Sequence, residues 1–170
     1  PTLTASSANF NGYPCLTFNT SQWMYNAVNL DGGALSTYTM FAVSRMNGGT
    51  NARLIASQST NWLFGFHSGT KGDMYGNAWI YDGATAADAV QHLYEVESNS
   101  NVAGGTKFYE AGTQITGGTP AGGGQTTTAG NPNGPGVIEL NGYSSGAEIS
   151  SGEVAEILYF NKVLTASERQ

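Results

Sequence analysis

Hydrophobic and polar residues alternate with a period of two along most of the chain, which is the pattern of half-buried β-strands. Turn signals such as Asp31-Gly32-Gly33, Asn47-Gly48-Gly49 and Asn141-Gly142 separate the alternating stretches. No stripe of apolar residues at helical spacing occurs before the last few residues. The expected strands are Cys15–Phe18, Trp23–Tyr25, Tyr38–Arg45, Arg53–Ser57, Trp62–Phe66, Asp73–Tyr75, Ala78–Tyr81, His92–Glu97, Lys107–Glu110, Val137–Leu140 and Glu153–Phe160.

Short strands at regular spacing predict an all-β fold, an antiparallel β-sandwich. The composition agrees, because 24 glycines and only 11% charged residues favour many turns between short strands. A chain of 170 residues is expected to form one domain over residues 1–170. Since it begins at Pro1 and stops at Gln170, where a helix is expected to begin, we expect it to be a segment of a longer protein.

Three segments depart from the strand pattern. Ala84–Val90 is rich in alanine but too short for an independent helix, so we interpret it as a loop. Gly117–Gly136 contains almost no apolar side chain and is expected to be a long exposed loop, a candidate contact element. Thr165–Glu168 has the spacing of a capping box, which predicts the start of a short C-terminal helix.

Charge and cysteine content narrow the function classes. The formal net charge is −6 and no stretch clusters Lys or Arg, so nucleic acid is a poor candidate partner. No run of about 18 apolar residues is present to insert into a membrane. Cys15 is the single cysteine, which excludes a disulfide within this segment, and its apolar neighbours predict a buried, inert thiol.

The C-terminal stretch Gly152–Glu168 combines a glycine, a strand with an acidic residue, an aromatic-Asn-basic turn and a capped helix start. It resembles the closing signature of the laminin-G-type domains in the concanavalin A-like lectin/glucanase superfamily. Phe10–Phe18, Tyr38–Arg45, His92–Val96 and Lys107–Gly112 resemble other strands of that family in the same order.

The resemblance implies a jelly-roll sandwich of the kind found in cell-surface, secreted and viral structural proteins. Asn61–His67 is most similar to the viral versions. The same sandwich hosts lectins, glycanases, adhesion modules and spacers, so the site has to be argued separately.

Carboxylates at glycanase spacing are missing. Glycanases of the family carry two carboxylates four residues apart on one strand, whereas Glu153 and Glu156 are three apart and fall on opposite faces of a regular strand. Glu156 occupies the family's recurring acidic position, which implies a half-buried structural role. Glu95 and Glu97 share a face but are interpreted as a solvated edge. We therefore expect no catalytic residues and no enzyme.

Other chemical motifs are weak. Gly142–Gly146 matches a nucleophile-elbow pattern, but no histidine follows it, so we interpret it as a loop between strands. Gly117–Gly124 lacks the lysine of a phosphate-binding loop. His67 and His92 are isolated and are interpreted as structural histidines rather than metal ligands.

Aromatic residues mark the candidate ligand site. Trp79 and Tyr81 alternate on one face of their expected strand, with Tyr75 one hairpin away, and aromatic faces stack on the apolar faces of sugar rings. The alternative is that these side chains fill the sandwich core.

Calcium is the candidate cofactor, because it takes carboxylates from scattered loops and leaves little motif. Asp31, Asp73 and Asp82, with Asp88, lie in or beside turns and are the candidate ligands. Aspartate in glycine-rich turns is also a common structural pattern.

We therefore predict a non-catalytic recognition or adhesion module that binds glycan or a partner protein at a cell or virion surface, outside the cell. The first alternative is a structural domain of a viral capsid, tail or fibre, which packs against neighbouring subunits without binding a free ligand. The second alternative is a glycoside hydrolase.

Overall fold

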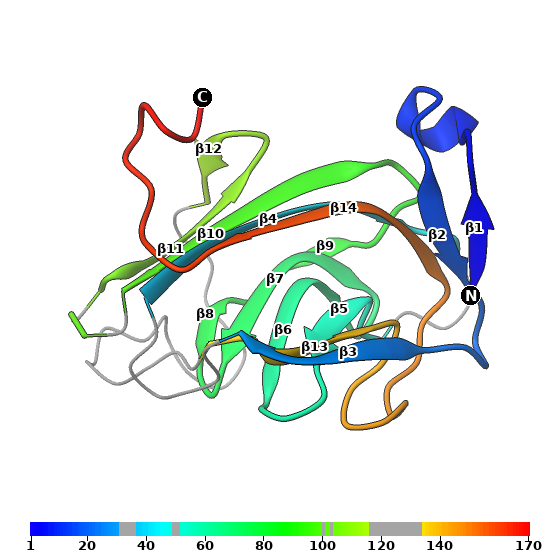
Figure 1. The fold of residues 1–170 in the computed structure, drawn as a ribbon, viewed down its shortest axis with the longest axis horizontal. Coiled ribbons are helices and arrows are strands. Elements are labelled where there is room, and N and C mark those ends of the chain that lie inside the picture. Colours follow the sequence, from blue (N-terminus) through cyan, green and yellow to red (C-terminus); the bar gives the residue numbers. More distant parts are fainter. Residues whose placement is uncertain (31–36, 49–51, 100, 103, 116–133) are drawn as a thin grey trace.

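The computed structural model describes residues 1–30, 37–48, 52–99, 101–102, 104–115 and 134–170. Two antiparallel sheets pack face to face (Figure 1). Sheet A has the order β1 (Thr2–Thr4), β2 (Cys15–Phe18), β14 (Gly152–Phe160), β4 (Thr37–Met46), β10 (His92–Asn99), β11 (Thr106–Glu110) and β12 (Thr113–Gln114). Sheet B has the order β3 (Met24–Leu30), β13 (Gly136–Leu140), β5 (Ile55–Ser57), β6 (Trp62–His67), β7 (Thr70–Gly76) and β8 (Trp79–Tyr81), and β9 (Thr85–Ala86) pairs with β7.

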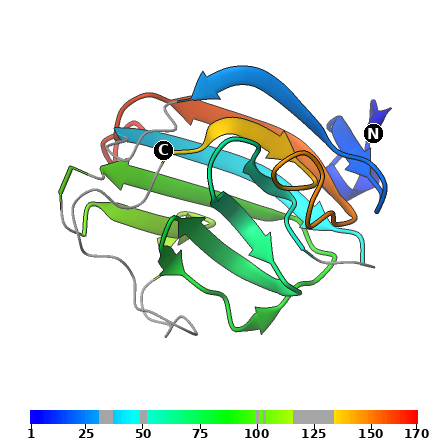
Figure 2. The ribbon, with the colours of Figure 1, turned by 90° about the horizontal axis from the view of Figure 1, so that it is seen from below.

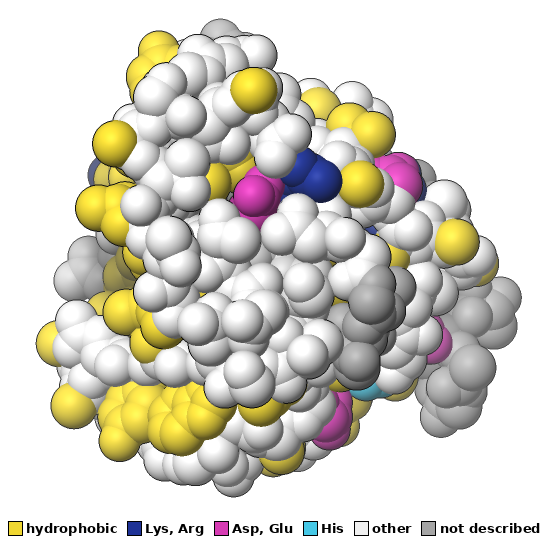
Figure 3. Space-filling model, turned by 90° about the vertical axis from the view of Figure 1, so that its right-hand side faces the viewer, with side chains coloured by type: hydrophobic (Ala, Val, Ile, Leu, Met, Phe, Trp, Pro, Cys, Tyr) yellow, Lys and Arg dark blue, Asp and Glu magenta, His cyan; other side chains and the backbone are white. Residues whose placement is uncertain are grey.

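The predicted all-β sandwich is confirmed, and each expected strand overlaps a strand of the structure. The described part of the chain has one helical element, the single 3-10 turn η1 (Ala8–Phe10). Figure 2 shows sheet B from below, with the strands of sheet A behind it. Seen from the end that carries η1, the surface is mostly uncharged, with few charged side chains (Figure 3).

Aromatic side chains from both sheets fill the core. Trp62, Phe64 and Phe66 alternate along β6 and point inward, where Phe64 packs edge-to-face on Phe108 with ring centroids 5.7 Å apart. The indole Nε1 of Trp62 donates a hydrogen bond of 3.0 Å to the hydroxyl of Tyr38 on the opposite sheet. Since both side chains are fully buried, this bond satisfies polar groups that water cannot reach.

The predicted capping box is present at the C-terminal end. The Thr165 amide donates to Glu168 Oε2 at 2.8 Å, and the Glu168 amide donates back to Thr165 Oγ1 at 3.3 Å. The predicted start of a C-terminal helix is wrong, because the backbone bond from the Glu168 amide to the Thr165 carbonyl at 3.0 Å closes a single turn and no helix follows in the described residues. The segment before this turn is anchored by a 2.9 Å hydrogen bond from the Leu164 amide to Thr39 Oγ1.

The remaining segment predictions have mixed outcomes. Cys15 is a buried free thiol, as expected. Ala84–Val90 is an irregular segment apart from the two residues of β9. Most of the Gly117–Gly136 loop lies outside the described residues, and its last residue begins β13. No helix in the described ranges is long and apolar enough to span a membrane.

Candidate functional site

Tyr75 and Trp79 form an aromatic pair on the outer face of sheet B. They lie directly opposite each other in the register of β7 and β8. Their rings meet edge-to-face with centroids 5.1 Å apart, and both side chains are partly exposed. Because the neighbouring Met74 and Ile80 are buried in the core, the pair is held against the sheet while its outer surface stays accessible.

Tyr81 does not join this pair. The register between β7 and β8 shifts between Met74 and Tyr75, so that Tyr81 pairs with Met74. The Tyr81 ring turns toward the core and lies 6.5 Å from the ring of Phe108 on sheet A. The prediction that Trp79 and Tyr81 share one face is therefore wrong, because the irregular pairing breaks the strict alternation of the strand.

His67 extends the aromatic surface at the end of β6. Its ring centroid lies 5.3 Å from that of Trp79, and its side chain is 23% exposed. Burial and the nearby positive charge of Arg53 lower the pKa of His67 below its usual value. The imidazole is therefore neutral at neutral pH and offers one hydrogen-bond donor and one acceptor, one of which faces Ser68 Oγ at 3.2 Å.

Polar side chains gather beside the aromatic surface. Arg53 Nε donates to Glu148 Oε2 at 2.6 Å, and Arg53 Nη1 donates to Asn61 Oδ1 at 2.9 Å. The guanidinium lies 4.3 Å above the centre of the Tyr143 ring. The Arg53 side chain is 8% exposed and that of Glu148 is 41% exposed, so the carboxylate is the part of this pair that faces solvent. Glu148 Oε2 also lies 3.9 Å from His67 Nε2.

The loop between β13 and β14 carries Tyr143 and Glu148, and it hangs below sheet B in Figure 1. The buried carboxylate of Glu139 fixes its tip by accepting hydrogen bonds from the Ser145 and Gly146 amides at 2.9 and 2.7 Å. Glu148 itself has a positive φ of 52°. A side chain on so constrained a backbone is held in place before any ligand arrives.

The candidate calcium ligands are only partly brought together. Asp73 is fully buried, and its carboxyl accepts a 2.7 Å hydrogen bond from the Gly83 amide and contacts Thr70 Oγ1 at 3.1 Å. The negative charge of Asp82 is close enough to act on the pKa of Asp73. Asp31 lies outside the described residues. Across the described ranges, no three His, Cys, Asp or Glu side chains are grouped as a metal centre would need.

The two histidines have different surroundings. His92 lies between two carboxylates, with Nδ1 2.6 Å from Glu110 Oε1 and Nε2 2.8 Å from Asp88 Oδ1. Asp88 also pairs with Lys71. This chain of contacts ties the segment before β10 to β11, so His92 has the structural role that the sequence predicted.

Glu95 and Glu97 share the outer face of sheet A, but they are not a solvated edge. Arg169 from the C-terminal segment covers both carboxylates, at 2.9 Å from Glu95 and 2.7 Å from Glu97. The two side chains are 7% and 6% exposed. The interpretation was wrong because a charged residue remote in sequence covers this part of the sheet.

Glu153 and Glu156 also differ from expectation. The pairing of β14 with β4 shifts between Val154 and Glu156, which leaves Ala155 as the extra residue of a β-bulge. Both glutamates therefore lie on the outer face. Glu153 is paired with Arg45 at 3.2 Å, whereas Glu156 is exposed and has no hydrogen bond or ion pair within the described chain. The predicted half-buried structural role of Glu156 is wrong.

The sequence did not identify Arg53, Asn61 or Glu148 as site residues. They come from three separate segments, before β5, between β5 and β6, and between β13 and β14, and they share no spacing or motif. Gly142–Gly146, interpreted as a loop between strands, lies in the loop that positions Glu148. Its densely spaced turn residues, Asn141 to Gly146, were the available signal that this loop is structured.

The fold is an antiparallel β-sandwich that is shared with domains of known structure. Among solved structures, the chain is similar to the CBM40 domain of the Ruminococcus gnavus IT-sialidase, with a TM-score of 0.51 and 14% identity over 90% of this chain and 95% of that chain. It is also similar to the NanB sialidase of Streptococcus pneumoniae (TM-score 0.54, 16% identity, 91% of this chain and 26% of that chain). A Trypanosoma rangeli sialidase gives a TM-score of 0.53 and 14% identity over 91% of this chain and 28% of that chain.

The chain thus spans about a quarter of the length of these two sialidases. No protein-family model and no curated protein matches the sequence. At such low identities the similarity shows a shared fold, so the function has to be argued from the site.

Proposed function

We propose that this domain is a non-catalytic carbohydrate-binding module whose glycan site is the outer face of β6, β7 and β8. The observation that carries the proposal is the partly exposed aromatic surface of Tyr75, Trp79 and His67, with the Glu148 carboxylate beside it. The lectin-like sandwich, shared with a carbohydrate-binding module, agrees with this function.

The chemistry of the surface suits a sugar ring. The C–H groups on one face of a pyranose pack on an aromatic ring, while its hydroxyls need both donors and acceptors at the edge. Trp79 supplies the ring, Glu148 supplies acceptors, and the ring nitrogen of neutral His67 that does not face Ser68 supplies one further donor or acceptor. Because Arg53 is already engaged by Glu148, Asn61 and Tyr143, it acts as the support that orients Glu148.

The proposal also covers the family, the location and the cofactor of the domain. The Gly152–Glu168 stretch supports a laminin-G-type domain of the concanavalin A-like superfamily. A glycan-binding module acts where glycans are displayed, so we propose an extracellular, cell-surface or virion-surface location. Calcium stays a proposed cofactor, with Asp82 as the candidate ligand whose negative charge acts on His67 of the aromatic surface.

The test is a glycan array, followed by calorimetric titration of the best-bound glycan, with and without calcium. Trp79→Ala should weaken binding by roughly tenfold or more, about 1.4 kcal/mol, because the stacking surface is lost. Tyr25→Ala is the matched control, since Tyr25 is an aromatic residue of sheet B that is 47% exposed but stacks on Trp23 instead.

An array without a bound glycan in either buffer would refute the proposal, as would equal losses for Trp79→Ala and Tyr25→Ala. A reducing-sugar assay on common polysaccharides tests the hydrolase alternative. Release of sugar that survives purification and disappears on substitution of Glu148 would make the domain an enzyme.

A structural role in an assembly is the second candidate, and β3 favours it. This strand lies at the edge of sheet B, and nearly all of its residues are exposed, including Met24, Tyr25 and Val28. Exposed edge strands can pair with another chain. Concentration-dependent association in analytical ultracentrifugation, lost in Val28→Lys, would support this role, and a monomer at all concentrations would refute it.

A further inference from the structure

The outer face of sheet A carries a groove that the proposed glycan site does not use. Figure 1 shows η1 and the C-terminal segment standing above opposite ends of this sheet, with the middle of the sheet between them. Two adjoining hollows of about 300 and 580 Å³ lie on this face. Val43, Leu93 and Glu156 line both hollows, which therefore form one continuous groove around Glu156.

Apolar side chains form most of the groove. Val43 and Leu93 make its floor where the two hollows meet. Leu93 is 42% exposed, Leu158 is 43% exposed and Tyr13, at the η1 side, is 71% exposed. A connected series of exposed large apolar side chains marks an interaction surface more often than a bare solvent face.

Glu156 is the free charge of this groove. The bulge at Ala155 turns its side chain outward between the apolar residues of β14 and β4. The other charged residues of the lining are engaged: Arg169 by Glu95 and Glu97, Glu168 by Lys162, and His92 by two carboxylates. A ligand therefore meets one unpaired negative charge in apolar surroundings.

We propose that this groove binds an extended peptide segment of a partner protein, in which a Lys or Arg is flanked by apolar residues. The cation pairs with Glu156, and the apolar neighbours fill the hollows on either side. An extended chain fits two adjoining hollows better than a compact ligand does.

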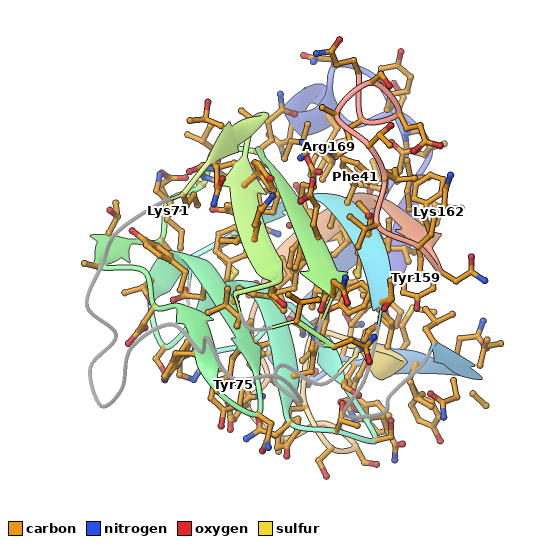
Figure 4. The ribbon with its side chains drawn as sticks, turned by 90° about the vertical axis from the view of Figure 1, so that its left-hand side faces the viewer. Phe41, Lys71, Tyr75, Tyr159, Lys162 and Arg169 are labelled. Carbon is orange, nitrogen blue, oxygen red and sulfur yellow. The ribbon has the colours of Figure 1, made fainter. Side chains whose placement is uncertain are left out.

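The groove is separate from the proposed glycan site. In Figure 4, Phe41 and Arg169 lie at the top of the molecule and Tyr75 lies at the bottom. The two faces belong to different sheets with the core between them. Each site is therefore testable without disturbing the other.

The test is a selection of a phage-displayed library of random linear peptides on the full domain, followed by fluorescence polarisation with the enriched peptides. Enriched sequences should place Lys or Arg between apolar residues. Glu156→Gln should weaken their binding by roughly tenfold, and Glu156→Lys by more, because repulsion replaces attraction. The affinity should also fall as the NaCl concentration rises.

Trp79→Ala is the control variant, since it lies on the other sheet and should leave peptide binding unchanged. Conversely, Glu156→Gln should leave glycan binding unchanged, so failure of one proposal is distinguishable from failure of the other. Because Glu156 is exposed and unpaired, its replacement should not unfold the domain. A selection without enrichment, or enriched peptides that bind Glu156→Gln as tightly as wild type, would overturn the proposal.

Discussion

Asp73 offers the sharpest test of how the candidate site is held. Asp73 lies within β7 and its carboxyl is fully buried. This burial raises the pKa of Asp73 to about 7. The hydrogen bonds agree with a protonated group. Thr70 Oγ1 lies 2.6 Å from the His67 carbonyl oxygen and 3.1 Å from Asp73 Oδ2. One hydroxyl has one hydrogen, so when it is donated to His67, the second contact needs a proton on Asp73.

The pKa shift makes stability depend on pH. The folded protein keeps the Asp73 proton up to about pH 7, whereas the unfolded chain releases it near 3.8. The folded state therefore binds more protons in this window, and the free energy of unfolding falls as the pH rises through it. A shift of about three pKa units corresponds to at most about 4 kcal/mol, reached above pH 7.

Asp73→Asn should remove this dependence. The side-chain amide can donate to Thr70 Oγ1 and accept from the Gly83 amide, which preserves both contacts without an ionisable group. Urea unfolding of both proteins should be measured at intervals between about pH 4 and pH 8. The free energy of unfolding of Asp73→Asn minus that of wild type should rise across the series by up to about 4 kcal/mol.

Asp88→Asn is the control with the opposite sign. Partial burial raises the pKa of Asp88, but hydrogen bonds from Lys71 and His92 lower it by more. The net result is a pKa below the usual value of an aspartate. The stabilising contribution of Asp88 is therefore present at neutral pH and is lost as the pH falls.

A constant difference in the free energy of unfolding between Asp73→Asn and wild type, within about 0.5 kcal/mol at all pH values, would refute a protonated Asp73.

Two further variants test contacts that hold the loop between β13 and β14 and the C-terminal segment in place. Gly146→Ala should destabilise the domain by about 1–3 kcal/mol and change tryptophan fluorescence, because its φ is 86° and a Cβ there would lie 2.4 Å from Trp23 Nε1. An unchanged unfolding midpoint would contradict this packing. Arg169→Ala should cost about 3 kcal/mol in urea unfolding, because it leaves Glu95 and Glu97 buried without their shared cation. A loss below about 0.5 kcal/mol would show that the C-terminal segment does not cover these carboxylates in solution.

Much of the fold was predictable because the alternation of apolar and polar residues can be recognised within each single strand. Trp62, Phe64 and Phe66 repeat with a period of two, and all three are buried between the sheets. The strands that the sequence missed are short ones. β1 contains three residues and β9 and β12 contain two each, so no alternating pattern can develop in them.

The sequence predicted only the part of the candidate site whose residues lie close together along the chain. Tyr75 and Trp79 are four residues apart on one hairpin, and a hairpin brings its two strands together. Arg53 and Glu148 meet because a loop between β13 and β14 reaches back to the segment before β5. Such a contact joins residues 95 positions apart and depends on the backbone of a structured loop, which side-chain periodicity does not encode.

The last strand shows why register limits what alternation can predict. Both alternating sets along β14 contain large apolar residues, with Val154, Leu158 and Phe160 in one and Ile157 and Tyr159 in the other, so hydrophobicity alone does not choose between them. The bulge at Ala155 lets Val154 and Tyr159 both face the core, where Tyr159 stacks on Tyr38 with ring centroids 5.8 Å apart. The same extra residue turns Leu158 and Phe160 outward together with Glu156. One irregularity in the pairing thus completes the core on the inner face and places an unpaired carboxylate among apolar side chains on the outer face.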